Sequence, residues 1–411
     1  MKDIKSKIVL LVVFFTLISL NIFGSIDLTM KSEAVILIDA DSGQILFEKN
    51  MNKREFPASI TKIMTGMLAL ENKDLNEVLT MTHEDVFSVE RDSSHIALNV
   101  GERISLLSAM YALAIESAND AANGIATLVS GDIKNFVDLM NERAKELGAV
   151  NTHFVTTNGL DDPNHYTTAH DMALIMRQAI QTPYFTTFFS EANFDIPPTN
   201  MQTNVRHLHN KNSLLNGNRH YEGLIASKTG FTKIAKHTLV SAAKRGDRTL
   251  IVVAMNSLGQ PDKYEDTMKL FDYGFNNFKN VALNKKDILK GLKGHQDYKK
   301  IKEIINQNDP TINFLLNEKY TLNDVTVTPV YDKINNQVNL AVNTKNEINT
   351  FPKLTELTLK QLHEPSKSKY SLILTYVFHF FKGVGYFLFG ILCLSLTVKT
   401  VRLIMNINKK K

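Results

Sequence analysis

The chain has 411 residues and a hydrophobic content of 44%, so it exceeds the size at which one hydrophobic core usually suffices and is expected to hold more than one domain. Its formal net charge of +5 belongs to the ends, because three lysines against one aspartate in residues 1–24 and five basic residues in 399–411 leave −2 for everything between. A near-neutral body argues against nucleic acid as a partner, since nucleic-acid binding needs a basic patch on the folded domain.

The N-terminus has the layout of a secretory signal peptide. Lysines precede the apolar run of residues 8–20, and the small residues Gly24 and Ser25 follow it. We therefore predict a signal peptide over residues 1–25. Because no A-x-A sequence marks a cleavage site, an uncleaved anchor is the second interpretation.

A hairpin and a helix are expected next. Residues 33–48 are predicted to form two strands joined by a turn at Asp41-Ser42-Gly43. A helix is predicted for residues 59–71, since Pro57 is a start signal and apolar residues recur at helical spacing. Its expected buried stripe consists of Ile60, Ile63, Met64, Met67 and Leu68.

This helix places a hydroxyl and an amine on one face. Ser59 and Lys62 are three positions apart, so Lys62 can reach the Ser59 oxygen and share its proton. The pattern S-x-x-K also starts at Ser241, in an expected strand, and at Ser366, in a polar linker, where no helical face joins the pair. An ordinary N-cap role is the alternative for Ser59, because serine is a good N-cap.

Two more short motifs follow along the chain. A helix predicted for residues 104–116 leads into Ser117-Ala118-Asn119, and another helix is predicted for residues 132–147. Lys228-Thr229-Gly230 occurs once and precedes a β-rich segment. Taken singly, the first motif is a helix end and the second a turn with a glycine. The expected elements after it are strands at 237–245 and 248–256 and a closing helix at 262–278.

The composition shifts toward asparagine and lysine after residue 280. The alternating stretches 325–331 and 337–343 predict short strands of a β-rich second domain over residues 281–360, for which we expect a spacer role. Residues 361–375, with proline and serines among charges, have the composition of a linker.

The C-terminus is predicted to anchor the chain in a membrane. Residues 376–398 are apolar apart from Lys382 and His379, and a run of about 23 residues is long enough to cross a bilayer. The basic tail at 399–411 follows at once, so the positive-inside rule places it in the cytoplasm and the folded body outside. A buried or interfacial helix is the alternative.

The sequence gives little support for disulfides, a cysteine nucleophile or a metal site. The only cysteine, Cys393, lies in the apolar tail, which excludes an intrachain disulfide and a cysteine nucleophile. The histidines at 207, 209, 220 and 237 lack a recognisable ligand spacing. We therefore predict neither a metal nor a cofactor.

The three motifs together are far more informative than each alone. S-x-x-K, S-x-N and K-T-G in this order are the signature of penicillin-binding proteins and class A β-lactamases, although Ala118 stands in the middle position of the second motif. Over residues 30–275 the chain resembles the serine D-alanyl-D-alanine carboxypeptidases of low molecular mass. The matching stretches are 34–43, 57–62, 116–122, 158–165, 169–171 and 228–232.

The resemblance implies an α+β fold in three parts. Residues 28–280 would form a β-lactamase/transpeptidase-like domain, an antiparallel sheet packed with helices plus a helical region. The small β-rich domain and the C-terminal membrane helix would follow it. The implied reaction is hydrolysis of the terminal D-Ala-D-Ala bond of peptidoglycan pentapeptide stems, and β-lactams would acylate the same serine.

Acyl transfer requires an activated serine. An amine takes the Ser59 proton only if its pKa falls well below about 10.4, and burial together with a second cation lowers it. Lys62 would be the general base, Lys228 the second cation, and the Ser117 hydroxyl a proton relay. By resemblance, the substrate would contact Asn119, Lys228, Thr229, Gly230 and Phe231, with the backbone N–H groups of Ser59 and Phe231 as the oxyanion hole.

Three departures from the family pattern stand out. Lys236 occupies a position where we expect glycine, the approach to K-T-G from Gly223 is longer than usual, and Lys211 stands where some relatives have arginine. Three alternative functions also stay open. They are a β-lactamase, for which no Glu-x-x-x-Asn motif lies between the second and third motifs, a non-hydrolytic penicillin-binding sensor or scaffold, and a cross-linking transpeptidase or endopeptidase.

Overall fold

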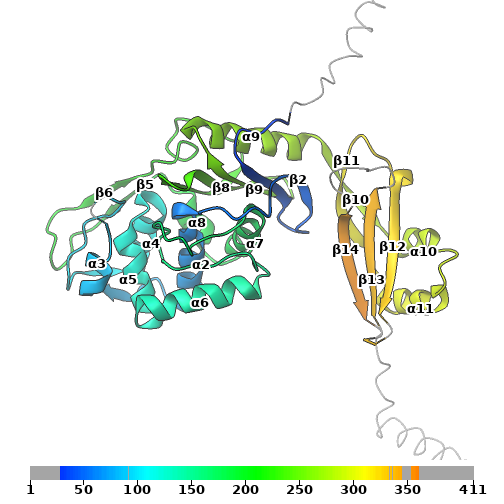
Figure 1. Cartoon of the computed structure of the whole chain (residues 1–411), viewed down its shortest axis with the longest axis horizontal. Coiled ribbons are helices and arrows are strands. Elements are labelled where there is room, and N and C mark those ends of the chain that lie inside the picture. The colour runs from blue at the N-terminus through cyan, green and yellow to red at the C-terminus, as the bar shows by residue number, and fades with distance from the viewer. Residues whose placement is uncertain (1–27, 91, 333, 336, 345–352, 361–411) are drawn as a thin grey trace, which may run out of the picture. The chain divides into compact units, whose positions relative to one another are not determined.

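The computed structural model describes residues 28–90, 92–332, 334–335, 337–344 and 353–360 (Figure 1). Contacts divide the chain into two compact units. The first unit holds the residues up to Gly291 together with Thr311–Thr328 and Ala341–Leu357. The second holds Leu292–Pro310, Pro329–Leu340 and the residues from Thr358 onward.

A five-stranded antiparallel sheet runs through the first unit in the order β2-β1-β9-β8-β7. The N-terminal hairpin β1–β2 confirms the predicted one, and its strand β1 pairs with β9, so segments far apart in the sequence lie side by side. β7, which carries the K-T-G motif, is an edge strand of the sheet. The strands are β1 (Ala34–Asp39), β2 (Ile45–Lys49), β7 (Leu224–Thr232), β8 (Lys236–Arg245) and β9 (Arg248–Ser257).

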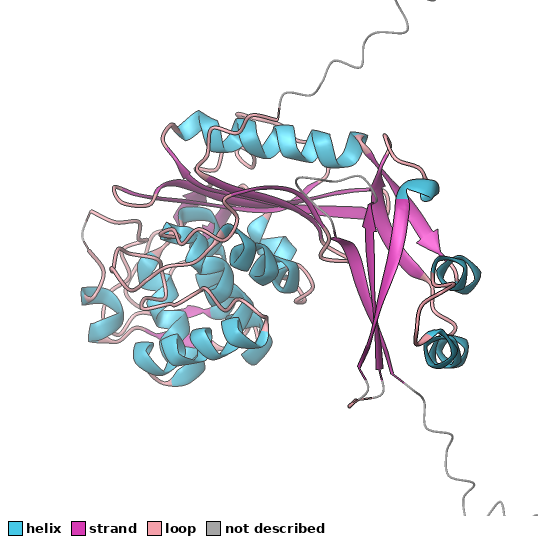
Figure 2. Cartoon of the chain, turned by 45° about the vertical axis from the view of Figure 1, so that its right-hand side comes forward, coloured by secondary structure: helices cyan, strands magenta, loops and turns pink. Residues whose placement is uncertain are grey.

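Both faces of this sheet are buried, because successive side chains of a strand enter two different hydrophobic cores. In β1, Ile36 and Ile38 belong to the core shared with the helical region, whereas Val35 and Leu37 belong to the core beneath α9 (Gln260–Asn276). Figure 2 shows α9 on one face of the sheet and the helices up to α8 on the other. The middle parts of β1 and β9 are therefore continuous apolar runs, residues 34–38 and 250–255, and do not alternate with polar residues.

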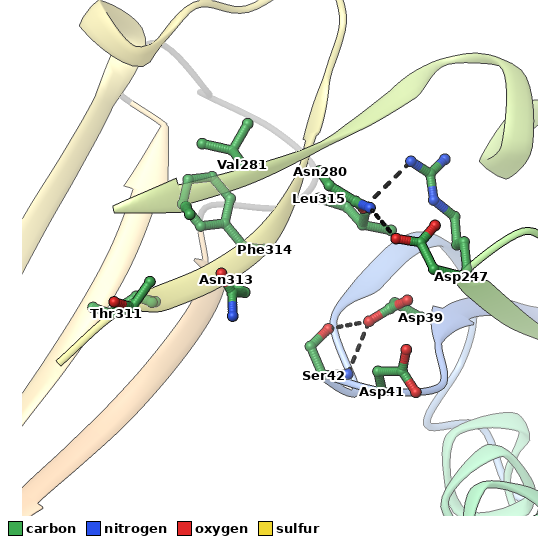
Figure 3. A pocket seen from close by; sticks show the side chains of 13 residues that line it. Asp39, Asp41, Ser42, Asp247, Asn280, Val281, Thr311, Asn313, Phe314 and Leu315 are labelled. Carbon is green, nitrogen blue, oxygen red and sulfur yellow. Dashed lines mark hydrogen bonds between the residues drawn. The ribbon is translucent and has the colours of Figure 1, made fainter. Parts of the chain in front are cut away.

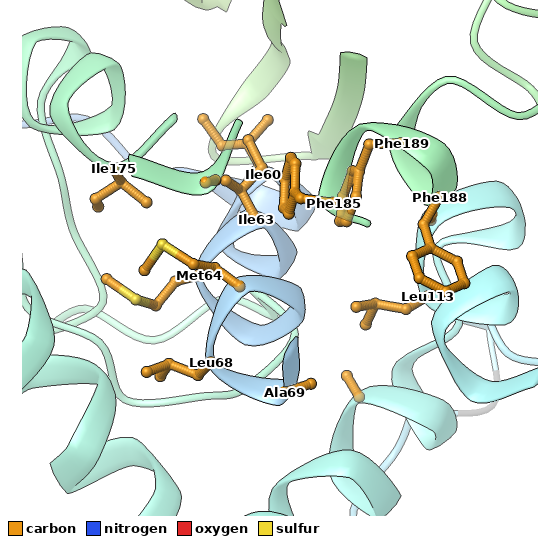
Figure 4. Close-up of a cluster of buried hydrophobic side chains, with 14 of the residues drawn as sticks. Ile60, Ile63, Met64, Leu68, Ala69, Leu113, Ile175, Phe185, Phe188 and Phe189 are labelled. Atoms are coloured by element: carbon orange, nitrogen blue, oxygen red, sulfur yellow. The ribbon is translucent and has the colours of Figure 1, made fainter. Parts of the chain in front are cut away.

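Helix α2 (Lys62–Asn72) lies at the centre of the first core. Its residues from Lys62 to Ala69 are all buried, which is unusual for the polar ones among them. Helices α7 and α8 and the segment before Ser117 surround it (Figure 4). The side chains that meet there include Ile63, Met64, Leu68, Leu113, Ile175, Phe185 and Phe189. This packing fixes the helix that carries the S-x-x-K motif.

The helical region also contains several short elements. The helices are η1 (Ala58–Thr61), α3 (His83–Phe87), α4 (Leu106–Tyr111), η2 (Ala112–Glu116), α5 (Asn119–Ser130), α6 (Ile133–Glu146), α7 (Ala169–Ala179) and α8 (Phe185–Phe189). Two small antiparallel two-stranded sheets accompany them, β3 (Val78–Thr80) with β4 (Arg103–Ser105) and β5 (Asn193–Ile196) with β6 (Arg206–His209).

Most predicted helices are confirmed, but the one at residues 104–116 is wrong as a single element. Its first residues belong to β4, and α4 begins only at Leu106 because the Ser105 side chain caps it by accepting from the Ser108 N–H. A turn of π-helix, η2, then replaces the α-helix. π-turns are frequent at functional sites, and this one ends at Ser117.

Further elements follow α9. The expected strands at 325–331 and 337–343 are confirmed as β12 and β13. The expected domain boundary after residue 280 falls within β10, and the division into domains stays a prediction. The elements are β10 (Phe278–Leu283), which pairs with β11 (Ile312–Asn317), α10 (Lys285–Gly291), α11 (Tyr298–Asn308), η3 (Leu322–Asp324), and the sheet of β12 (Val325–Asp332), β13 (Gln337–Thr344) and β14 (Lys353–Lys360).

The expected signal peptide (1–25), linker (361–375), membrane helix (376–398) and basic tail (399–411) lie outside the described residues. Among the residues that are described, none of the helices combines the length and the apolar character needed to cross a membrane.

Candidate active site

Ser59 lies in the 3₁₀ turn η1, directly before helix α2. Lys62 is the first residue of α2, and its Nζ lies 3.1 Å from Ser59 Oγ. The N-cap of α2 is Thr61, so the N-cap interpretation of Ser59 is wrong. Ala58, just before the serine, has a φ of 52°, a left-handed conformation that costs roughly 1–2 kcal/mol in a residue with a Cβ.

The surroundings of Lys62 favour its role as a proton acceptor from Ser59. Besides Ser59, its Nζ contacts two carbonyl oxygens, Asn119 Oδ1 at 2.6 Å and the Asn158 backbone oxygen at 2.7 Å. A carbonyl oxygen only accepts, so both of these contacts require an N–H. A neutral amine has two N–H bonds and one lone pair, and the lone pair is then left for the Ser59 hydroxyl.

The environment of Lys62 also favours the neutral form of its amine. Lys62 is fully buried, and burial together with the charge of Lys228 lowers its pKa well below the usual value, while Asp120 has the opposite, smaller effect. Its expected role as base therefore has a physical cause in this structure.

A second serine–lysine pair faces the first. Lys228 Nζ donates to Ser117 Oγ at 2.9 Å and to its neighbour's carbonyl, the Thr229 oxygen, at 3.0 Å. Ser117 ends the π-turn with a left-handed backbone, φ 59° and ψ 35°, and joins it to α5, so S-x-N here connects two helices and is no ordinary helix end. Burial, followed by the nearby charge of Lys263, lowers the pKa of Lys228 to about 7.

Asn119 links the base to the wall of the pocket. Its Oδ1 accepts from Lys62, and its Nδ2 donates to Ser93 Oγ at 2.9 Å. An amide nitrogen has two N–H groups, so one of them is left for a ligand. Ser93 was missed in the sequence, because it lies on the loop before β4 and belongs to no motif.

Gly230 allows strand β7 to approach the nucleophile. A Cβ built there would lie 2.8 Å from the Ser59 backbone nitrogen and 2.5 Å from Thr238 Oγ1. Any side chain would therefore push β7 away from Ser59. The neighbouring Phe231 is 57% exposed, and its ring stacks at a tilt on His237 with 4.5 Å between centroids.

These groups line one pocket of about 430 Å³. All the predicted catalytic and substrate-binding residues except Lys62 line this pocket. Lys62 lies behind Ser59 and Asn119. The lining includes Ser59, Ser93, Ser117, Asn119, Lys211, Lys228, Thr229, Gly230, Phe231, Lys263 and Tyr264.

Lys263 is the second functional candidate that sequence reasoning missed. It lies in the first turn of α9, is only 3% exposed, and is 5.2 Å from the centroid of the Tyr264 ring. Burial lowers its pKa to about 8. Its sequence context, one lysine among alternating charges of a helix, carries no signal for a buried position.

A larger pocket, of about 690 Å³, lies elsewhere in the first unit, between the turn after β1 and strands β10 and β11 (Figure 3). Five of its polar residues bond to one another, since Ser42 donates to Asp39, and Asn280 accepts from Arg248 and donates to Asp247. It contains no serine–lysine pair. The chemistry therefore points to the smaller pocket.

No cluster of three or more metal-ligating side chains is present in the part of the chain that the structure describes.

Comparison with known proteins identifies the family. The Peptidase_S11 model, D-alanyl-D-alanine carboxypeptidase, matches residues 23–259, which is more than half of the chain. The chain belongs to this family. The resemblance seen in the sequence is thereby confirmed.

Two relatives named as D-alanyl-D-alanine carboxypeptidases are similar to more than half of the chain. The D-alanyl-D-alanine carboxypeptidase DacF of Bacillus subtilis is 32% identical over 265 residues, which are 64% of this chain and 66% of that protein. DacB2 of Mycobacterium tuberculosis, named in the same way, is 34% identical over 245 residues, 58% of this chain and 81% of that protein. The chain thus spans just under two thirds of the length of the Bacillus relative.

A solved structure supports the fold. Penicillin-binding protein 6B of Escherichia coli matches with a TM-score of 0.61 and 24% identity, over 81% of this chain and 96% of that one. The predicted transpeptidase-like fold, a sheet with helices, is confirmed, while the C-terminal membrane helix lies outside the described residues.

The departures from the family pattern have structural counterparts. Lys236 has a φ of 58°, which explains why glycine is expected at this turn. The long approach to K-T-G contains a break in register between Leu224 and Ala226, a β-bulge that takes up one extra residue. Lys211 is 78% exposed and pairs with Glu116 at 3.2 Å.

Proposed function

We propose that this protein is a serine-type D-alanyl-D-alanine carboxypeptidase that removes the terminal D-alanine from peptidoglycan pentapeptide stems. One observation carries the proposal: the buried Lys62 Nζ contacts two carbonyl oxygens and Ser59 Oγ. Family membership agrees with it.

In the proposed acylation, Ser59 Oγ attacks the carbonyl carbon of the D-Ala-D-Ala bond while its proton passes to Lys62. The backbone N–H groups of Ser59 and Phe231 stabilise the developing oxyanion. The close approach of Gly230 to the Ser59 nitrogen brings the two segments that carry these groups together. A β-lactam acylates Ser59 in the same way.

Expulsion of D-alanine requires a proton at its nitrogen. The Ser117 hydroxyl relays this proton from the lysines, and Lys228, with a pKa of about 7, is able to give and take protons near neutral pH. Water then hydrolyses the acyl-enzyme, with the same groups acting in reverse.

The substrate is proposed to bind along β7. Its terminal carboxylate meets Lys228 and Thr229, with Lys263 as a second cation on the wall, and Asn119 holds an amide of the stem through its remaining N–H. Two buried lysines in the pocket wall, Lys228 and Lys263, suit a small anionic ligand.

We further propose that the enzyme works outside the cytoplasm at the cell envelope, with a signal peptide over 1–25 and a membrane anchor over 376–398. This part rests on the sequence pattern alone, because those residues lie outside the described ones. The residues from 281 to 360 are proposed to form a spacer domain.

The test incubates the full chain, the Ser59→Ala variant and Ser366→Ala, the serine of another S-x-x-K pattern, with a pentapeptide stem and measures free D-alanine. We expect release by the wild type and Ser366→Ala and none by Ser59→Ala. Release that survives Ser59→Ala would refute the assignment. Stable penicillin labelling without any D-alanine release would favour the sensor, rapid penicillin turnover the β-lactamase, and consumption of cross-linked stems the endopeptidase.

A further inference from the structure

The backbone that presents Ser59 is strained. Ala58 has a φ of 52°, and a residue with a Cβ keeps such a conformation only where its surroundings over-determine it. Because Ala58 directly precedes Ser59, groups that fix the position of the Ala58 carbonyl also fix the position of the nucleophile.

Two buried side chains form a chain of hydrogen bonds that ends at this carbonyl. Thr61 Oγ1 donates to the Ala58 oxygen at 2.9 Å, and the same Oγ1 lies 2.9 Å from His165 Nε2. Thr61 is fully buried and His165 is 1% exposed, so water does not replace these bonds.

The direction of each bond is fixed by counting donors. His165 Nδ1 lies 3.0 Å from the Val155 N–H and 3.2 Å from the Thr156 N–H, so it accepts and carries no proton. The ring is neutral, because burial lowers its pKa to about 4, and its proton is on Nε2, which donates to Thr61. The single hydroxyl proton of Thr61 then goes to Ala58.

The loop that holds His165 also contacts the base. Its Asn158 oxygen accepts from Lys62 Nζ, and Gly159 lies so close to Ala58 that a Cβ would be 1.9 Å from the Ala58 oxygen. The turn that carries Ser59 and the base Lys62 therefore both contact one loop, residues 155–165.

We propose that His165 and Thr61 are positioning residues for acylation, which lock the Ala58–Ser59 turn to the 155–165 loop so that Ser59 Oγ stays aligned with Lys62 and the oxyanion donors. Neither residue touches the substrate; both act through Ala58. The inference rests on the proposed function of Ser59. Misplacement of a nucleophile by about 1 Å costs roughly 100-fold in rate.

The experiment uses the full chain and five variants beside the wild type. Thr61→Val removes the hydroxyl with little change in shape, and Thr61→Ser restores it. His165→Asn keeps an acceptor near the Nδ1 position but removes the donor to Thr61, and the double variant combines it with Thr61→Val. The fifth, Thr127→Val, is the matched control, because it breaks a comparable side-chain bond, 2.6 Å to Asp85, away from the nucleophile.

Two reactions are measured for each protein: the rate of acylation by benzylpenicillin, followed by the mass of the adduct, and D-alanine release, for which kcat and KM are determined. Thr61→Val is expected to lower the acylation rate and kcat by about 10- to 100-fold with KM nearly unchanged. Thr61→Ser is expected to recover most of the rate. The double variant is expected to match the slower single variant, because both changes break one chain.

Three results would overturn the proposal: Thr61→Val at the wild-type rate, Thr61→Ser as slow as Thr61→Val, or Thr127→Val equally slow. The proposed function fails separately, if the wild type forms the Ser59 adduct but releases no D-alanine. In that case adduct formation still reports on positioning. A wild type without any adduct overturns both.

Discussion

Lys228 donates a 2.9 Å hydrogen bond to Ser117, and the two residues come from opposite sides of the pocket, the edge strand β7 and the end of a π-turn. Burial and the charge of Lys263 lower the pKa of Lys228 to about 7, and the charge of Lys228 in turn helps to lower that of Lys62. The three buried lysines are therefore electrostatically coupled.

Replacing the base is expected to stop acylation. In Lys62→Met no group accepts the Ser59 proton, so the rate of penicillin acylation should fall by about 10²- to 10⁴-fold. Lys49→Met is the matched control, because Lys49 Nζ also donates to two carbonyl oxygens, those of Met30 and Ser32, but contacts no serine hydroxyl. Acylation by Lys62→Met within tenfold of the wild type would contradict the assigned role.

The pH profile is expected to depend on Lys263. Acylation needs neutral Lys62, so it rises with pH through the lowered pKa of Lys62, and it falls again as Lys228 loses its charge above about pH 7. Lys263→Met removes a cation that lowers the pKa of Lys228. The alkaline limb of the profile should therefore move to higher pH.

The measurement is the acylation rate between about pH 5 and 10, with Lys269→Met as control. Lys269 lies on the same helix but donates to the Thr29 oxygen, away from the pocket, so its removal should leave both limbs in place. An alkaline limb that stays fixed, or moves down, in Lys263→Met would show that Lys228 does not set it.

The motif-bearing residues were predictable because each motif reports a local requirement. Ser59 and Lys62 share one helical face, and Gly230 marks a close backbone approach, so spacing and residue type suffice. Lys263, Ser93 and His165 were not predictable as contributors, because they meet the site only through tertiary packing. The π-turn before Ser117 was missed for a related reason, since its apolar spacing is that of an ordinary helix.

A methyl group on Gly230 is expected to disable the site. It would clash with the Ser59 nitrogen and Thr238 Oγ1, so Gly230→Ala should lower the acylation rate by about 100-fold and stability by about 1–3 kcal/mol. Gly291→Ala, where a Cβ has its nearest neighbour at 3.9 Å, should leave acylation unchanged. Acylation by Gly230→Ala at the wild-type rate would show that β7 need not approach Ser59 so closely.

The turn between β7 and β8 is expected to become more stable with glycine at position 236. Lys236 is exposed and has a φ of 58°, so a Cβ costs roughly 1–2 kcal/mol there, while glycine adds back about 0.5–1 kcal/mol of chain entropy in the unfolded state. Lys236→Gly should thus raise stability by about 0.5–1 kcal/mol in chemical unfolding. Lys233→Gly, in the same turn at a negative φ, should lower it, because there only the entropic cost remains. Equal losses in both variants would mean that the Lys236 side chain makes a stabilising contact that outweighs its backbone strain.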